Sequence, residues 1–466
     1  MSLCGKKNKF LNYVLIVSSC IVFLHGNAQQ ELSFLFAGDV MSHGPQIAAA
    51  RNDLTDSYDY DAGFQFVKPI IEQHDIAIAN LEVTHAGKPY SGYPQFSAPD
   101  ELSPALMNAG FDVLLTCNNH SCDGGAKGVI RTLDILDNLG IKHTGTFRNK
   151  AERELNYPLM LNQNGIKVAI LNYTYGTNGI VVAAPLIINY IDSAVIKKDI
   201  KRAKELNADY IICTMHWGTE YESLPSAYQK KWEKYCYELG VDMVIGSHPH
   251  VIQPMQKKVV NGKEKLTVWS MGNYVSNQKD RYKNGGLMVG TTLKKEEGKV
   301  SVKEVHHSFA YVHIKQEKGS KYYYLLPEFN YAELRPDFMA DSAIFKMEQF
   351  FSDSRKLFTE HSIGSNEYTV SRESEVGDLF KSYLQGYYSV LLEERSDINL
   401  PELMKTELSN YIHKVIEPNG KYAYVSGIYN TKEQAYGNKR FFQDCLVSNP
   451  LKIVFISPRE FTLIEE

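Results

Sequence analysis

Short, mostly apolar segments, each followed by a polar residue able to bind a metal ion, recur along the first half of this chain. The segments are 32–37, 76–79, 111–117, 210–215 and 241–245. The residues that follow them are Asp39, Glu82, Asn119 with His120, His216, and His248 with His250. Ligands of open α/β sheets bind beyond the carboxyl ends of the strands. We therefore predict that the five segments are strands of one sheet and that their ends converge on one cleft.

Helical patterns alternate with these strands from about residue 31 to 310, which is typical of an α/β protein. Apolar residues at helical spacing predict helices over 125–139 and 226–239, each closed by a glycine. A third helix is expected to start at Ser193 as its N-cap. Three further strands, predicted to be antiparallel, are 266–270, 286–292 and 299–305.

The pattern changes near residue 315, after a polar stretch. Beyond it, the spacing predicts helices over 341–360 and 376–394 and then a strand, a helix and a strand over 422–426, 431–443 and 451–457. The predicted organisation is a leader (1–28), a main domain (29–315), a helical linker region (316–410) and a small βαβ domain (411–466).

Composition is that of an ordinary globular protein, with 466 residues, 44% hydrophobic and 22% charged. The net charge of −4 argues against a nucleic-acid partner. Two of the seven cysteines, Cys117 and Cys122, flank the Asn118-Asn119-His120 segment. They form either a small disulfide or, as the frequent burial of cysteine favours, two buried free thiols.

The N-terminus has the features of a targeting segment. Lys6, Lys7 and Lys9 precede an apolar run over 13–24, which is too short for a membrane span. We expect a signal peptide cleaved after Ala28; a lipid-modified Cys20 and an uncleaved anchor are the alternatives. Each places the mature chain outside the cytoplasm, in the periplasm or at the cell surface.

Imidazole and carboxylate groups together suit zinc, iron and manganese. Any one of these residues alone is weak evidence, because a single histidine is more often a surface or core residue than a ligand. Their shared position after apolar segments is what predicts a common metal site.

These residues lie in motifs that resemble the CapA family of capsule-synthesis proteins associated with poly-γ-glutamate. The motifs are Gly38-Asp39-Val40-Met41, Asn80-Leu81-Glu82, Gly110-Phe111-Asp112, Asn118-Asn119-His120-Ser121 with Asp123 and Gly125, His216-Trp217-Gly218 with Glu220, Gly246-Ser247-His248-Pro249-His250-Val251, and Ser270-Met271-Gly272-Asn273-Tyr274. The resemblance runs in order through about residues 31–280.

The resemblance implies an α/β fold like that of calcineurin-like metallophosphoesterases, a four-layer αββα sandwich, here with a smaller C-terminal α+β region. It also implies one or two divalent ions (Mn, Zn or Fe) that activate a water molecule as nucleophile. The first ion would be held by Asp39, Glu82 and His250, and the second by Glu82, Asn119, His216 and His248. In the same comparison His120 is the proton donor or transition-state stabiliser, and Asp123 orients it.

Two positions depart from the phosphoesterase pattern. Met41 stands where that pattern has histidine, and a thioether is a poor ligand for hard divalent ions. Glu82 stands in place of aspartate, which leaves ligation possible with a longer reach. His43 is a candidate replacement for the missing histidine. His85 is either a substrate contact or a surface histidine, and Lys279 with Arg281 either bind an anionic polymer or form a solvated basic loop.

The resulting functional expectation is an exported protein of capsule or cell-surface polymer biosynthesis that hydrolyses or transfers a phosphoester or an amide such as a γ-glutamyl bond. The alternative is a non-catalytic assembly or export factor that binds the polymer with the same fold. Expected partners are an anionic cell-surface polymer and capsule-synthesis membrane proteins. The tail around Tyr422 and Gly427 loosely resembles SPOR domains, which adds peptidoglycan as a partner.

Overall fold

The computed structural model describes residues 30–52, 56–316, 320–328 and 338–368 in full, together with the backbone of Glu317, and beyond residue 368 it describes Ala435 and the backbone of five strands. The expected signal peptide and the Cys20 alternative lie outside these residues. Among the described helices, none combines the length and the apolar character needed to cross a membrane.

The elements are given in chain order, first the strands and then the helices. The strands are β1 (Gln30–Val40), β2 (Arg51–Asn52), β3 (Ser57–Tyr58), β4 (Ile76–Leu81), β5 (Val113–Leu115), β6 (Lys142–Thr144), β7 (Thr146–Phe147), β8 (Leu159–Gln163), β9 (Ile166–Thr174), β10 (Ile187–Ile188), β11 (Tyr210–His216), β12 (Met243–Ser247), β13 (Met255–Val260), β14 (Lys263–Val268), β15 (Asn273–Val275), β16 (Gly285–Glu296), β17 (Lys299–Glu317), β18 (Ser320–Pro327), β19 (Asn366–Glu367), β20 (Tyr387–Arg395), β21 (Ile412–Ile416), β22 (Tyr422–Tyr429), β23 (Lys452–Ser457) and β24 (Glu460–Leu463). The helices are α1 (Gly44–Ala50), α2 (Asp61–Phe64), α3 (Lys68–Ile71), α4 (Leu102–Asn108), α5 (Gly125–Leu139), α6 (Lys150–Asn156), α7 (Ser193–Glu205), α8 (Ala227–Leu239) and α9 (Asp341–His361).

Two large sheets form the body of the protein. The first has the order β18-β17-β16-β1-β4-β5-β6, with β15 paired to β1 and β19 to β17. The second has the order β13-β14-β12-β11-β9-β8. The prediction of a single sheet is therefore wrong: β1, β4 and β5 belong to the first sheet, and β11 and β12 belong to the second.

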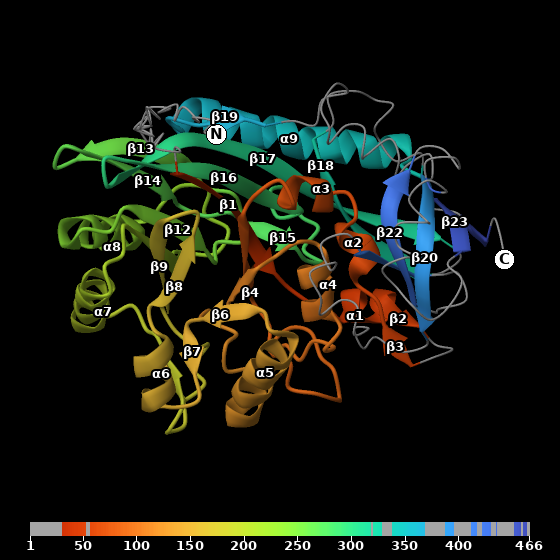
Figure 1. Ribbon diagram of the computed structural model, residues 1–466, viewed down its shortest axis with the longest axis horizontal. Coiled ribbons are helices and arrows are strands. Elements are labelled where there is room, and N and C mark those ends of the chain that lie inside the picture. The colour runs from red at the N-terminus through yellow and green to blue at the C-terminus, as the bar shows by residue number, and fades with distance from the viewer. Residues whose placement is uncertain are drawn as a thin grey trace, which may run out of the picture.

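The two sheets pack face to face with helices outside them, which confirms the expected four-layer α/β sandwich (Figure 1). On β9, Val168 and Ile170 belong to the core between the sheets, whereas Leu171 and Tyr173 belong to a second core under α7 and α8. Successive strand residues point to opposite faces, so one strand serves both cores. On the outer face of the first sheet, α9 packs on β17, where the Phe358 ring lies 5.3 Å from that of Phe309.

Local capping explains where the main helices begin and end. Helix α8 begins after Ser226, whose side chain accepts from the backbone N–H of Gln229 in a capping box, and Gly240 closes it. Helix α5 has the predicted bounds and ends at Gly140 with φ of +70°. Helix α7 is capped by Asp192 rather than by Ser193. Both residue types are good caps, and the aspartate lies at the position where the backbone is still extended.

The C-terminal strands form a separate antiparallel sheet in the order β21-β22-β20-β23-β24. The helix predicted over 376–394 is wrong where the chain is described, because residues 387–395 form β20 between β22 and β23. Pairing on both sides overrides the local helical spacing. The helix predicted over 341–360 is confirmed as α9. The division into domains and the SPOR-like tail stay predictions.

Candidate metal centre

The predicted site residues come together at one end of the two sheets. Asp39 lies near the end of β1, opposite Asn80 on the parallel strand β4, and Glu82 follows β4 directly. His216 ends β11, and His248 and His250 follow the neighbouring strand β12. The carboxylates thus come from one sheet and the imidazoles from the other.

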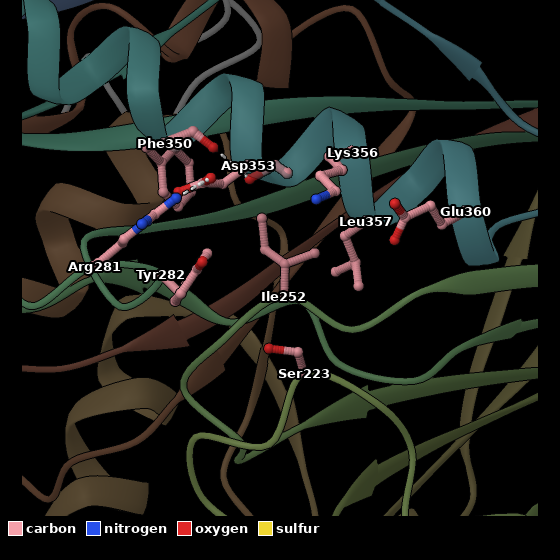
Figure 2. A pocket seen from close by; sticks show the side chains of 10 residues that line it. Ser223, Ile252, Arg281, Tyr282, Phe350, Asp353, Lys356, Leu357 and Glu360 are labelled. Atoms are coloured by element: carbon pink, nitrogen blue, oxygen red, sulfur yellow. Dashed lines mark hydrogen bonds and ion pairs between the residues drawn. The ribbon is translucent and has the colours of Figure 1, made fainter.

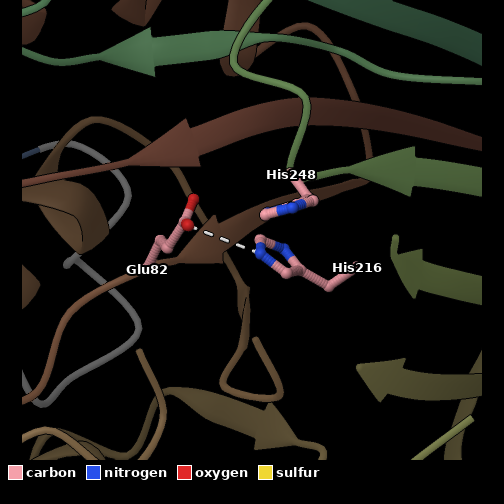
Figure 3. Close-up of side chains that lie close together, drawn as sticks. All are labelled: Glu82, His216 and His248. Atoms are coloured by element: carbon pink, nitrogen blue, oxygen red, sulfur yellow. Dashed lines mark ion pairs between the residues drawn. The ribbon is translucent and has the colours of Figure 1, made fainter. Parts of the chain in front are cut away.

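Two overlapping groups of side chains have potential ligand atoms within 4.8 Å of one another, and both groups are fully buried. One group is Asp39, Glu82 and His250, and the other is Glu82, His216 and His248 (Figure 3). Glu82 Oε1 lies 3.4 Å from His216 Nε2 and 3.7 Å from His250 Nε2. Glu82 is therefore the residue common to both groups.

Asn119 joins the second group. Its Oδ1 lies 2.7 Å from His216 Nε2. Its Nδ2 donates to Asn178 Oδ1 over 3.3 Å, so the amide is oriented with its oxygen toward the histidine. All six residues predicted as metal ligands consequently lie around one point of the structure, and their role as ligands stays a prediction.

The pKa values of these residues are shifted because their side chains are buried close to one another. Burial raises the pKa of Asp39, but the neighbouring His250, whose Nδ1 lies 3.2 Å from Asp39 Oδ2, outweighs this effect and brings the pKa down to about 2. Burial and the neighbouring Asp39 raise the pKa of Glu82 well above its usual range. Burial lowers the pKa of His216 to about 3. His250 is also buried, but Glu82 and Asp39 bring its pKa up to about 9.

The donor atoms of the centre fit a divalent cation. Glu82 is completely buried, and neither of its carboxylate oxygens has a hydrogen-bond partner. Nδ1 of His248 is also buried without a partner. Burial of such groups is unfavourable unless another group satisfies them. A cation among these oxygens and nitrogens would do so, and the mixture of carboxylate, amide and imidazole suits Mn, Fe or Zn.

The backbone around the histidines is strained and held from several sides. His248 and His250 have φ of +101° and +57°, values that residues other than glycine seldom adopt. Asn273 supports this segment through its Nδ2, which donates to the His250 carbonyl over 3.2 Å. The Gly272 carbonyl accepts from the Asp39 N–H at 2.9 Å. The segment 270–274 therefore supports both halves of the centre.

His120 and Asp123 form a pair beside the two groups. His120 Nδ1 lies 2.7 Å from Asp123 Oδ2, and both side chains are buried. Asp123 Oδ2 also accepts from the Phe96 N–H at 2.6 Å, and the edge of the Phe96 ring packs against His120. The ring orientation of His120 is thus fixed through one nitrogen, which leaves the other for a reacting group.

Three residues considered from the sequence do not join the described ligand groups. Met41 is buried in the hydrophobic core. His43 caps α1, and its Nδ1 lies 3.1 Å from Gln46 Oε1 and 3.3 Å from the Asn277 N–H donor, so it is not the replacement ligand. His85 is not a surface residue, because it is fully buried, and its Nε2 lies 2.7 Å from Ser103 Oγ.

The two cysteines near the centre, Cys117 and Cys122, are buried free thiols. This arrangement confirms the favoured alternative over a disulfide.

Sequence reasoning did not identify Asn80 and Glu220 as site residues. Asn80 Nδ2 donates to Asp39 Oδ1 at 2.8 Å and lies 3.3 Å from His216 Nδ1. Its position two residues before Glu82 was the available signal, since residues i and i+2 of a strand share a face. Glu220 forms a third group with His248 and His250.

A separate cavity of about 230 Å³ lies beneath α9, with Ile252, Leu357 and Phe350 among its lining residues (Figure 2). Arg281 makes a bidentate ion pair with Asp353 there, at 2.7 Å for both contacts. None of the clustered residues lines this cavity. Arg281 is therefore held in an ion pair at the surface, with its side chain 55% exposed, and its contact with a polymer stays a prediction.

Comparison with known proteins gives two kinds of match. The family described as "Bacterial capsule synthesis protein PGA_cap" matches residues 33–278. The chain is 29% identical over 261 residues to "Capsule biosynthesis protein CapA" of Bacillus anthracis, covering 53% of this chain and 61% of that protein. It is 29% identical over 281 residues to "PGA biosynthesis protein CapA" of Bacillus subtilis (strain 168), covering 57% and 68%. The match thus spans about three fifths of the first relative.

Solved structures to which the chain is similar include the NAD nucleotidase NadN of Haemophilus influenzae, with 14% identity, a TM-score of 0.40 and coverage of 76% of this chain and 67% of that one. The calcineurin-like phosphoesterase YfkN of Bacillus subtilis has 14% identity, a TM-score of 0.35 and coverage of 70% and 98%. The family assignment rests on the sequence matches.

Proposed function

Because this chain belongs to the bacterial capsule synthesis protein family PGA_cap, we propose that it is an exported, divalent-metal-dependent hydrolase or transferase that acts on an anionic cell-surface polymer of the poly-γ-glutamate type. The names of the two Bacillus relatives refer to capsule and PGA biosynthesis, and they support the choice of polymer. The bond attacked is a phosphoester or an amide such as a γ-glutamyl link.

One observation carries the metal-dependent part of the proposal. Glu82 presents two buried carboxylate oxygens without hydrogen-bond partners, between imidazoles contributed by the opposite sheet. A carboxylate that only balanced charge would be expected to accept hydrogen bonds from its neighbours. A bound divalent ion would supply Lewis-acid chemistry, lowering the pKa of water and neutralising charge on the substrate.

The residues of the chain have distinct tasks in this proposal. Asp39, Glu82, His216, His248, His250 and Asn119 bind the metal. His120 donates a proton to the leaving group, because its ring is fixed by Asp123 at 2.7 Å and lies beside the ligand groups. Asp123 is a positioning residue, which holds the His120 ring through Nδ1. Tyr175, half-exposed with its ring 4.6 Å from that of His248, borders the site.

The test is to measure metal content and hydrolysis with the purified mature chain. The substrates are an activated phosphodiester and a γ-glutamyl anilide, each with added Mn²⁺. We expect stoichiometric metal and turnover in the wild type, and loss of both in Asn119→Ala and His248→Ala. His361→Ala, at the exposed end of α9, is the matched control.

A wild-type chain without stoichiometric metal and without hydrolysis of either substrate would overturn the enzymatic proposal. If poly-γ-glutamate binding then survived Asn119→Ala and His248→Ala, a non-catalytic assembly or export factor would be the better description. The core position of Met41 in place of a ligand is the observation that favours this second function.

A further inference from the structure

Glu220 is an acidic residue that lies outside both ligand groups derived from the motif pattern. In the structure its carboxylate forms a group with His248 and His250 in which the potential ligand atoms lie within 4.8 Å of one another. The two histidines are buried, whereas Glu220 is exposed. It therefore approaches the two histidines from the solvent-exposed side.

The backbone holds Glu220 in this position. Trp217 is fully buried, and its N–H donates to the Ser247 carbonyl, which ties the segment to the end of β12. Gly218 has φ of +98°, which permits the turn that follows. The Tyr221 N–H then donates to the Pro249 carbonyl at 2.7 Å, between the two histidines. Glu220 is thus fixed at the backbone on both sides, while its side chain is exposed.

Each of the two histidines has a nitrogen atom without a hydrogen-bond partner that is able to bind a metal ion. Nδ1 of His248 and Nδ1 of His250 are buried and have no hydrogen-bond partner. His250 Nδ1 does lie 3.2 Å from Asp39 Oδ2, but the two atoms are not aligned as a hydrogen bond. Because buried nitrogens without a hydrogen-bond partner are unfavourable, they are stronger evidence for a bound cation than an acidic cluster alone is.

The ligand set on the His250 side is also short of one member. It contains Asp39, Glu82 and His250, while Met41 lies in the core and His43 caps α1. We propose that Glu220 supplies the missing ligand, so that the ion on the His250 side is held by Asp39, Glu82, His250 and Glu220. The Glu220 carboxylate is grouped with His248 and His250 but not with Asp39 or Glu82, so its exposed side chain must turn inward to bind this ion.

This ligand set predicts a metal preference. Three carboxylates and one imidazole form an oxygen-rich site, and carboxylates suit Mn²⁺ whereas imidazole suits Zn²⁺ well. The Glu82–His216–His248 side keeps a larger share of nitrogen donors. Loss of the Glu220 carboxylate should therefore weaken Mn²⁺ binding more than Zn²⁺ binding.

The inference rests on the metal-binding part of the proposed function, and the experiment separates the two. Mn²⁺ and Zn²⁺ affinities are measured by calorimetry for the full mature chain, for Glu220→Gln and for the control Glu222→Gln, which changes a neighbouring exposed carboxylate. Anomalous diffraction from Mn²⁺-soaked crystals locates the ions. Thermal unfolding without metal confirms that both variants fold, as expected for exposed positions.

We expect an ion at about 2.0–2.2 Å from a Glu220 oxygen in the wild type. In Glu220→Gln, Mn²⁺ affinity should fall by about tenfold or more, the lower end of what loss even of an indirect partner causes. Equal Mn²⁺ affinity in Glu220→Gln and wild type, or an ion on the His250 side beyond bonding distance of Glu220, would overturn this inference alone. A wild-type chain that binds neither metal would overturn the proposed metal dependence as well.

Discussion

At the scale of single residues, the centre depends on neutral side chains as much as on charged ones. Asn80 contacts both Asp39 and His216, which belong to different sheets, and the Asn118 amide donates to the Leu81 carbonyl at 2.8 Å just before Glu82. These amides set the direction of the ligand atoms without adding charge. Their effect should therefore appear in metal affinity as well as in folding.

We expect Asn80→Ala to weaken metal binding by about 10- to 100-fold, because Asp39 Oδ1 loses the donor that orients it. Calorimetry with Mn²⁺ measures the change. The matched control is Asn172→Ala, a buried asparagine whose Oδ1 accepts from the Cys117 N–H and whose hydrogen bonds in the described structure include none to a predicted ligand. Both variants should lose about 1–3 kcal/mol of unfolding free energy, but only Asn80→Ala should lose affinity; equal affinities in the two would contradict this role.

At the scale of elements, close contact between strand ends positions the ligands. A Cβ at Gly38 would lie 2.1 Å from the Gly272 carbonyl oxygen, next to Asp39. A Cβ at Gly246 would lie 2.0 Å from the Trp269 carbonyl oxygen, near the end of β12. Backbone atoms cannot move aside as the end of a flexible side chain can. Glycine is therefore required at positions 38 and 246, where two backbone segments lie in close contact.

Gly38→Ala should therefore destabilise the fold by about 1–3 kcal/mol or more, the usual cost of overpacking. Denaturant unfolding followed by tryptophan fluorescence measures this change. Gly176→Ala is the control, since a Cβ there meets nothing within 4 Å. An unchanged unfolding midpoint in Gly38→Ala would show that β1 and the 270–274 segment can move apart.

A histidine pair joins the segment after α3 to β17. His74 Nε2 lies 3.3 Å from His306 Nε2, and burial together with the charge of His306 lowers the pKa of His74 to about 4. The unfolded chain has the ordinary value near 6.5, so it binds more protons than the folded chain between pH 6.5 and about 4. The free energy of unfolding should fall as the pH drops through this window.

Thermal unfolding between pH 7 and pH 4.5 checks this expectation. His74→Gln should flatten the decline, because it removes one group that must stay uncharged when folded. The exposed His361→Gln should leave the pH dependence as in the wild type. A decline of the same steepness in both variants would exclude the His74–His306 pair as a source of acid sensitivity.

The sequence predicted the strand-end residues and the main helices because those signals are local. Asp39, Glu82, His216 and His248 each follow an apolar run, and Gly140 and Gly240 mark helix ends. The division into two sheets was not predictable in this way, because it depends on distant pairing such as β1 with β16. Strand β20 was missed for the same reason. Asn80 and Glu220 depend on which neighbours the fold brings near them.

At the scale of the whole molecule, the centre lies between the two sheets and uses both. Asp39 and Glu82 extend from the first sheet, and His216, His248 and His250 extend from the second. A bound ion would link the ends of the sheets in addition to the apolar core between them. Metal binding should therefore stabilise the folded chain as a whole.

Removal of metal by a chelator should lower the unfolding temperature of the wild type. At a free metal concentration 100 times the Kd, the bound ion contributes about 2.7 kcal/mol. Differential scanning calorimetry with and without Mn²⁺ measures the difference, which His248→Ala should reduce and His361→Ala should retain. Equal unfolding temperatures with and without Mn²⁺ in the wild type would contradict an ion bridging the sheets.

The left-handed backbone at His248 and His250 has a consequence for how the chain would respond to laboratory evolution. Each such residue costs about 1–3 kcal/mol of conformational strain. A library selected only for heat resistance should therefore enrich glycine or asparagine at these two positions, and a library selected for turnover should retain both histidines. Opposite outcomes at these two positions would show that thermal stability and catalytic activity favour different residues there.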